Sequence, residues 1–379
     1  MGKSRVVGTR NQIRAMRGVI VAYVCMVMMF SSSTSLAQQT PDKETTTAKT
    51  FTFDDVLQLL DSSEKRFSYL GTKFIIDYTP TRRSTTLVKV TYGAGLEKKE
   101  VSPLQNGEPQ IILDDGKYLW HYIPSQASVI KKKQQLSLGK ISQRIYSQNK
   151  LIQENYSIRI EQQDLAAIMP PIPQVPSVMG NVMVMFEPKH HDRPTWKLLI
   201  ESEHGLIVRT EVYDVAGNLA LLSAFSELTF QPKLSEKSFV VTVPKGTKME
   251  TSVENHFRTI EEAQAQASFS IVAPTYLPPG FILNGIISSP TERGEKVQFS
   301  YIDGMSTISI FEEKQATEVD ASLGITKEVD INSSIKGTFY DHGLIKILRW
   351  ALDAERIVTL VGEVSDSELV KIAASIIAN

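Results

Sequence analysis

The histidine and cysteine content of the chain restricts the chemistry that it can perform. It has six histidines and one cysteine in 379 residues. The only histidine pair, His190 and His191, is followed by Asp192, and such residues can bind a metal ion. Neighbouring residues of a strand point to opposite faces, so the two imidazoles cannot share one ion there. If the two residues lie in a turn instead of a strand, this argument against a shared ion is weaker. We interpret the segment as an exposed polar turn and expect no metal site.

Two acidic segments resemble general acid/base pairs but have the composition of turns. Asp114 and Asp115 precede Gly116, and Asp303 precedes Gly304. Asp followed by Gly between alternating apolar residues is typical of a β-hairpin. The sequence also lacks a nucleophile-elbow motif, a zinc-protease motif, a phosphate-binding glycine loop and a dinucleotide fingerprint. It therefore predicts a protein that is not an enzyme and needs no cofactor.

The first 37 residues have the pattern of a secretory signal peptide. Five basic residues precede an apolar run at 18–30, and Ser35-Leu36-Ala37 follows as a cleavage site. A retained membrane anchor is the alternative, but thirteen residues span only about 20 Å as a helix, against about 30 Å of hydrocarbon. Cys25 lies inside the run and not at a lipoprotein cleavage site. We expect cleavage after Ala37 and a periplasmic protein without cysteine.

Charge excludes two further classes of function for the mature chain. The whole sequence has 41 basic and 42 acidic residues, and loss of residues 1–37 changes the net charge from −1 to −6. Proteins that bind nucleic acid or anionic membranes without specificity need a basic face. A mildly acidic chain argues against both partners.

The mature chain divides into two predicted domains. Residues 38–50 are polar and read as a flexible leader, and residues 51–244 form the first domain. It begins with an amphipathic helix for which Thr52 is the N-cap and Asp55 its partner. Alternating strands follow, and so many twisted strands curl. The prediction is an α+β fold whose first domain is an antiparallel half-barrel wrapped around a helix.

Two segments interrupt the strands of the first domain. Residues 131–153 lose the alternation and predict a helical or lid-like insertion, and 169–178 form a proline-rich surface loop. Strands are expected to resume at 181–187, 195–201, 206–214, 218–231 and 238–243.

A polar connector at 245–268, with a short helical pattern, leads to a smaller α+β domain at 269–379. Six strands are expected there, at 281–288, 296–302, 305–312, 336–341, 344–350 and 356–362. The domain ends in a helix with Ser365 as N-cap and Glu368 closing the capping box. Leu369, Ile372 and Ile376 form its buried face.

Apolar side chains of the predicted sheet could form a groove on its concave face. Methionine is flexible and suits surfaces that adapt to apolar ligands, although ordinary core filling explains the same residues. A curved sheet that its helix does not fill could hold an acyl chain or a peptide. Sequence parity alone does not tell which face is concave. The groove candidates are Phe74, Ile76, Tyr78, Val88, Val90, Tyr118, Trp120, Met183, Met185, Trp196 and Leu198.

Three regions of the chain resemble the sigma-E regulatory protein family RseB/MucB. They are 67–71, 95–101 and 107–109 near the start, several positions between 188 and 217 in the middle, and a set that begins with Tyr276-Leu277-Pro278-Pro279-Gly280-Phe281. The set continues with Tyr301-Ile302-Asp303-Gly304-Met305 and ends with 358–364. The pieces occur in the right order over nearly all of the mature chain. The insertion at 131–153 and the proline loop depart from the family pattern.

The resemblance implies a first domain similar to the lipoprotein carriers LolA and LppX. It also implies a protein that binds the periplasmic domain of a membrane-bound anti-sigma factor and responds to a lipid-like signal, such as lipopolysaccharide or lipoprotein acyl chains. Within the matched segments Tyr301, Asp303, Met305 and Phe311 are candidates for contact with that partner. A homodimer stays open. The alternative function is a periplasmic lipoprotein or lipid carrier of the LolA type.

Overall fold

A computed structural model describes seven stretches of the chain: 51–93, 95–105, 107–133, 141–163, 181–291, 294–314 and 325–377. The described residues form two compact units. One contains 51–78 and 83–252, and the other contains 79–82 and 253–377. The predicted signal peptide, the leader at 38–50 and the proline loop at 169–178 lie outside the described residues.

The first unit begins with helix α2 (Phe53–Arg66), whose start is capped as the sequence predicts. The hydroxyl of Thr52 accepts a hydrogen bond from the amide of Asp55 at 3.2 Å. In return, the Asp55 carboxylate accepts one from the amide of Thr52 at 2.9 Å. This reciprocal cap satisfies two amides that have no partner within the helix.

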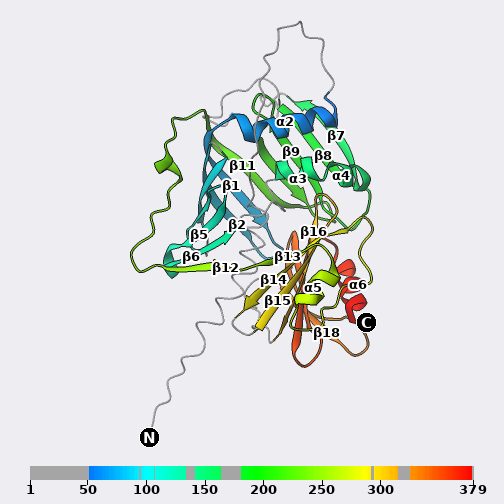
Figure 1. The fold of residues 1–379 in the computed structure, drawn as a ribbon. Coiled ribbons are helices and arrows are strands. Elements are labelled where there is room, and N and C mark those ends of the chain that lie inside the picture. The colour runs from blue at the N-terminus through cyan, green and yellow to red at the C-terminus, as the bar shows by residue number, and fades with distance from the viewer. Residues whose placement is uncertain are drawn as a thin grey trace. The chain divides into compact units, whose positions relative to one another are not determined.

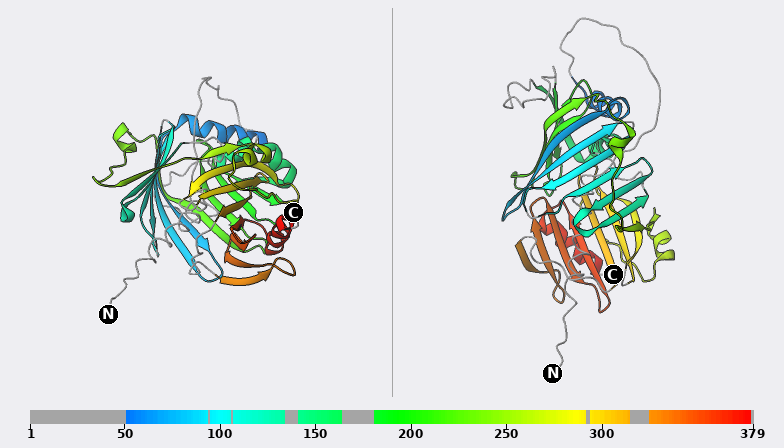
Figure 2. Two further views of the ribbon diagram at one scale, coloured as in Figure 1. Left: turned by 60° about the horizontal axis from the view of Figure 1, so that its bottom comes forward. Right: turned by 90° about the vertical axis from the view of Figure 1, so that its left-hand side faces the viewer.

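The first unit is built on a twelve-stranded sheet, shown with α2 in Figures 1 and 2. Its order is β12-β6-β5-β4-β3-β2-β1-β11-β10-β9-β8-β7, and every neighbouring pair is antiparallel except β12 with β6. The strands are β1 (Tyr69–Tyr78), β2 (Arg83–Gly93), β3 (Leu96–Pro103), β4 (Gln110–Asp114), β5 (Tyr118–Ile123), β6 (Ser128–Lys133), β7 (Tyr156–Gln163), β8 (Asn181–Pro188), β9 (Thr195–Glu201), β10 (Ile207–Tyr213), β11 (Leu219–Phe230) and β12 (Lys248–Ser252).

Local turn chemistry in this sheet follows the sequence. Asp114 and Asp115 join β4 to β5, and Gly116 takes a positive φ of 81° that favours glycine. The 3-10 turn η1 (Pro124–Gln126) joins β5 to β6. His190, His191 and Asp192 lie in the turn between β8 and β9, with His191 exposed. The predicted turn is confirmed, but of its three residues only His191 is exposed, and His190 and Asp192 are half-buried.

Two expectations for this unit need correction or refinement. The strand expected at 238–243 is absent from the described structure, where a 3-10 turn, η3 (Glu236–Phe239), occupies its start. Pro244 lacks an amide hydrogen and limits pairing at its end. The described part of the 131–153 insertion contains the end of β6 and the helices α3 (Ile141–Ser147) and α4 (Asn149–Asn155).

The second unit has an eight-stranded antiparallel sheet of order β13-β14-β15-β16-β20-β19-β18-β17. Its strands are β13 (Asn255–Phe257), β14 (Ile282–Thr291), β15 (Gly294–Ile302), β16 (Thr307–Lys314), β17 (Ile325–Asp330), β18 (Lys336–His342), β19 (Ile345–Ala351) and β20 (Arg356–Gly362). Six of them match the sequence prediction closely. The prediction missed β13 and β17.

Two helices complete the second unit, α5 (Ile260–Gln266) and α6 (Asp366–Ile377). Leu369, Ile372 and Ile376 are buried in the core of this unit, as the spacing predicts. The amide of Glu368 donates to the hydroxyl of Ser365 at 3.4 Å, which confirms Ser365 as the cap. The expected connector, 245–268, contains β12 of the first sheet together with β13 and α5 of the second unit.

A buried carboxylate attaches the segment after α5 to this sheet. Glu312 of β16 is fully buried, and its Oε1 accepts a hydrogen bond from the amide of Val272 at 2.8 Å. Arg356 of β20 lies 3.7 Å from its Oε2. Burial raises the pKa of Glu312 to about 7, against the smaller lowering effects of Val272 and Arg356. The carboxyl therefore titrates near neutral pH.

Glu312 should make the unfolding free energy depend on pH, and its raised pKa determines the direction of that dependence. The folded pKa, about 7, exceeds the ordinary value of 4.5, so the folded state binds the proton more tightly between these values. The contribution of Glu312 to stability is complete below pH 4.5 and falls as the pH rises from 4.5 to about 7. Glu312→Gln keeps the acceptor for Val272 and removes the titration. We expect the variant to exceed the wild type in unfolding free energy at pH 8 by up to about 3 kcal/mol.

The measurement is urea unfolding of the mature protein at pH 4, 6 and 8. The advantage of the variant should shrink towards zero at pH 4. Glu313→Gln, one residue along on the other face of β16, is the matched control and should show no such trend. An equal effect of Glu312→Gln at all three pH values would contradict the assignment.

Candidate functional site

Helix α2 identifies which face of the first sheet is covered. The ring of Phe53 in α2 lies 6.1 Å from that of Phe186 in β8, at an angle of 78°. Phe186 pairs with Trp196 of β9, so both point to the helix side, and Leu198 shares that side two residues further on. All three sheet residues are buried. Two of the predicted groove residues, Trp196 and Leu198, are thus core residues on the helix-facing side.

The strand register extends this face across the sheet. Val212 of β10 pairs with Trp196 on one side and with Leu221 of β11 on the other, and Leu221 pairs with Asp77 of β1. Directly paired residues share a face, so Asp77 and the alternate positions of β1 face the helix side. Lys73 is one of these, and it pairs with Val88 of β2. Val88 and, two residues on, Val90 therefore also lie on the helix-facing side.

The same register places the other seven groove candidates on the opposite face. Phe74 pairs with Leu87, and Trp120 pairs with Leu113. Each of these residues lies next to a helix-facing residue of its own strand, so its side chain points to the other face. The sequence analysis treated all eleven candidates as one surface, and the structure separates them. The physical reason is the two-residue period of a strand, which reverses the face with each one-residue offset. The seven are Phe74, Ile76, Tyr78, Tyr118, Trp120, Met183 and Met185.

The helix-facing side is apolar on β8 and β9 and charged on β3 and β4. Glu97 and Lys99 form a buried ion pair of 2.7 Å there, and Lys99 pairs with Ile112 of β4. In the next strand, the ring of His121 is 2.8 Å from the side-chain oxygen of Gln110. Burial, with a smaller effect of Lys132, lowers the pKa of His121 to about 4, so the ring is neutral at physiological pH. This part of the helix-facing side is therefore polar, although Glu97 and Lys99 are buried.

A cation–aromatic cluster lies on the opposite face, and we call its members Asp115, Tyr118, Trp120 and Lys131 the Trp120 cluster. The ammonium of Lys131 is 3.8 Å from the ring centre of Tyr118 and 4.3 Å from that of Trp120. Asp115 accepts a 2.6 Å hydrogen bond from the indole of Trp120. Partial burial raises the pKa of Asp115, but hydrogen bonds from Trp120 and Tyr118 outweigh it and hold the pKa below its ordinary value.

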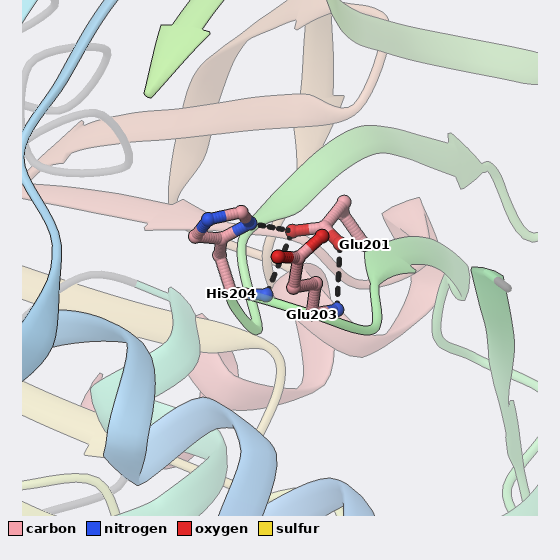
Figure 3. A group of neighbouring side chains, drawn as sticks. All are labelled: Glu201, Glu203 and His204. Atoms are coloured by element: carbon pink, nitrogen blue, oxygen red, sulfur yellow. Dashed lines mark hydrogen bonds and ion pairs between the residues drawn. The ribbon is translucent and has the colours of Figure 1, made fainter. Parts of the chain in front are cut away.

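One three-residue group could in principle hold a metal ion (Figure 3). Glu201, Glu203 and His204 each offer one ligand atom, and these atoms lie within 4.8 Å of one another. The Glu201 carboxylate already accepts hydrogen bonds from the amides of Glu203 and His204 and from Nδ1 of His204, the last at 2.8 Å. A metal would have to displace these donors. The arrangement has the chemistry of a buried turn.

Aromatic packing explains why this turn is buried. The ring of His204 stacks on Phe230, at the end of β11, with centres 3.7 Å apart and planes at 5°. The ring of Phe67, directly after α2, lies edge-on to that of His204, with centres 4.3 Å apart and planes at 75°. The turn therefore joins the end of the helix to the end of a central strand. The sequence analysis did not single out His204, because the two aromatic partners are far from it in sequence.

The four partner-contact candidates of the second unit are all buried. The Asp303 carboxylate accepts hydrogen bonds from the amides of Met305 and Ser306 at 2.9 and 2.7 Å and so closes the hairpin between β15 and β16. Tyr301 belongs to the apolar core, on the same face as Phe299. Met305 is inaccessible, and Phe311 lies on the other face of the sheet from Tyr301, with 7% of its surface exposed. Their roles in this structure are architectural.

Comparison with known proteins identifies the fold. A domain family of unknown function, DUF4367, matches residues 271–376. No curated protein matches the sequence. A chain in the complex structure of Pseudomonas aeruginosa MucA/MucB is 17% identical, with 85% of this chain and 96% of that chain covered and a TM-score of 0.52. A structure of MucB in complex with MucA(peri) is 15% identical, with coverages of 85% and 97% and a TM-score of 0.51.

The chain has the MucB fold. Because the alignment covers almost all of a MucB chain, both units take part in the likeness, and the resemblance to the RseB/MucB family that the sequence predicts is supported at the level of fold. A LolA superfamily protein from Nitrosomonas europaea covers 51% of this chain with a TM-score of 0.24, which supports no conclusion. The fold is α+β, and the half-barrel remains a prediction. Among the described residues, no helix is long and apolar enough to cross a bilayer.

The turn around His204 gives a direct test of its role. His204→Ala removes the stacked ring and one donor to a buried carboxylate, and such losses cost about 2–4 kcal/mol. We expect the variant to lose this much unfolding free energy in urea at pH 7. His191→Ala, in the exposed turn after β8, is the control and should change stability by less than about 0.5 kcal/mol.

Metal addition tests the alternative role of the same residues. The melting temperature of the tag-free mature protein should be the same with EDTA and with a tenfold excess of zinc chloride. A ligand that binds only the folded state raises the melting temperature. A zinc-dependent rise that Glu201→Gln abolishes would show that the group is a metal site.

Proposed function

We propose that this protein is a periplasmic, non-catalytic regulator that binds the periplasmic domain of a membrane-bound anti-sigma factor. The observation that carries the proposal is the likeness to MucB over 85% of the chain, which extends through both units. The MucB structures that it resembles hold MucA as their partner. A second unit gives a regulator additional surface for a peptide, whereas a simple carrier does not need one.

The proposal includes an exported protein and a lipid-like signal. The first 37 residues have the sequence of a signal peptide. In the proposed mechanism, the first unit forms a half-barrel, and an amphiphile that binds there favours a conformation with lower affinity for the anti-sigma factor. A ligand shifts such an equilibrium only by the difference between its affinities for the two states.

The competing function is a carrier of lipids or lipoproteins, and the helix-facing side argues against its simplest form. Trp196 and Leu198 are buried beside a helix, and Glu97 and Lys99 bring charge to the other part of that side. An acyl chain makes no hydrogen bonds to such groups, so a lining with buried charges disfavours it. Carriage, and equally the binding of the amphiphilic signal in the first unit, would need a movement of α2 or a site elsewhere.

Capture from the native periplasm distinguishes the two functions. Tagged protein that begins at residue 38 should retain a single-span membrane protein encoded beside a sigma factor, identified by mass spectrometry. Purified lipopolysaccharide should reduce the amount retained. Native mass spectrometry of the same preparation measures bound lipid. Stoichiometric lipid or acylated protein without an anti-sigma protein would favour the carrier instead.

A further inference from the structure

The strand β12 is an unusual member of the first sheet. It comes from the connector, lies at the sheet edge beside β6 (Figure 1), and forms the only parallel pair among the described strands. Lys248 pairs with Ser128 at one end and Ser252 with Lys132 at the other. The edge of β6 therefore accepts an extended segment in parallel register.

Side-chain packing contributes little to this pairing. Met249 is 59% exposed, and the ion pair between Lys248 and Glu250 lies on the surface with 75% and 47% of the two side chains exposed. The strand is held mainly by backbone hydrogen bonds, each of which contributes about 1 kcal/mol net. Parallel pairs are also slightly less stable per residue than antiparallel pairs. Four of the five residues of β12 are exposed and none is buried, so little side-chain packing opposes its detachment.

The strand that β12 covers is held independently. All six residues of β6 pair with β5, and Val129 is 1% exposed. Lys131 packs on the rings of Tyr118 and Trp120. Detachment of β12 would therefore leave β6 in place with its outer hydrogen-bonding groups open to another strand.

The chain on either side of β12 allows it to detach. Residues 231–247 separate it from β11 and contain only the short turn η3. Two residues, 253 and 254, lead from β12 to β13 of the second unit. Release of β12 would break no other strand and would lengthen the free chain between the two units.

We propose that this edge of β6 is a strand-exchange site, at which an extended peptide with an acidic C-terminal half pairs in place of β12. Charge determines the chemistry of the peptide, because β6 ends in Lys131, Lys132 and Lys133. In parallel register the C-terminal half of an added strand lies beside these residues. Addition of a strand to an exposed edge is a common mode of peptide recognition. The inference goes beyond the proposed function and does not depend on the identity of the anti-sigma partner.

The tether of β12 determines how the site must be tested. A tethered segment competes at an effective concentration of about millimolar, so a free peptide of equal strength binds little to the wild type. The double variant Glu250→Pro/Thr251→Pro removes this competition. Proline has no amide hydrogen, and adjacent strand residues donate to opposite sides, so one of the two changes removes a bond to β6.

The probe is a fluorescein-labelled peptide with the sequence of residues 245–254, KGTKMETSVE. By fluorescence anisotropy we expect it to bind the proline variant at least tenfold more tightly than the wild type. Met249→Ala/Thr251→Ala keeps every amide and both glutamates and is the control, with wild-type behaviour. A peptide with lysine at both glutamate positions should bind the proline variant at least fivefold more weakly at low salt. The difference should shrink in 0.5 M sodium chloride.

Hydrogen exchange of the wild-type protein supplies a second readout. Alternate amides of β6 face β5 and β12. In the wild type, the amides that face β12 should exchange at least tenfold faster than those that face β5. Residues 38–379 contain no cysteine, so Ser128→Cys/Lys248→Cys can form a single disulfide between paired positions. Oxidation of this pair should remove the difference, and reduction should restore it.

Two outcomes would overturn the proposal. One is a proline variant that keeps the circular dichroism spectrum and melting temperature of the wild type but binds the probe no better. The other is equal protection of all β6 amides in the wild type, which would show that β12 does not detach. If the proline variant fails to fold, the exchange experiment alone decides.

Discussion

The strand register of the first sheet determines which side chains α2 can cover. Residues that pair directly share a face, so the position of Phe186 under Phe53 fixes the orientation of paired residues as far as β5. The burial of Trp196, Leu198, Val88 and Val90 follows from that single constraint. The same constraint directs Phe74, Met185 and Trp120 away from the helix, although their sequence patterns look alike.

Most acidic residues that could have suggested catalysis serve the architecture instead. Asp303 closes a hairpin, Glu201 binds the amides of its own turn, and Asp115 orients Trp120. Glu312 holds the segment at Val272 against the second sheet. In each case the carboxylate accepts hydrogen bonds from protein donors, which offset part of the cost of burying it.

The proposed binding of an anti-sigma factor and the proposed strand exchange at β6 both require that a chain of two sheets bind a peptide. The connector supplies an edge strand to the first sheet and then, after two residues, a strand to the second. A peptide that replaced β12 would change the length of free chain between the units. Binding at one edge could in this way alter the behaviour of the whole molecule, by a change that needs no catalytic group.

The sequence alone determined most of the local structure and the α+β fold class. Helix caps at Thr52 and Ser365, hairpins at Asp114 and Asp303, and most strands depend on neighbouring residues, so local patterns predict them well. Local patterns wrongly predicted a strand at 238–243 and did not predict β13 and β17. Short strands at an edge or in a connector show only weak alternation of apolar and polar residues. The family resemblance likewise follows from ordered local segments.

Tertiary structure alone decided the faces of the sheet and the contacts between distant residues. Alternation shows that two faces exist, but only pairing with neighbouring strands and with α2 shows which face is covered. Three contacts join segments that are far apart in sequence or differ in pattern: His204 with Phe67 and Phe230, Lys131 with Trp120, and β12 with β6. Such contacts arise from packing of the whole chain, and no local propensity encodes them.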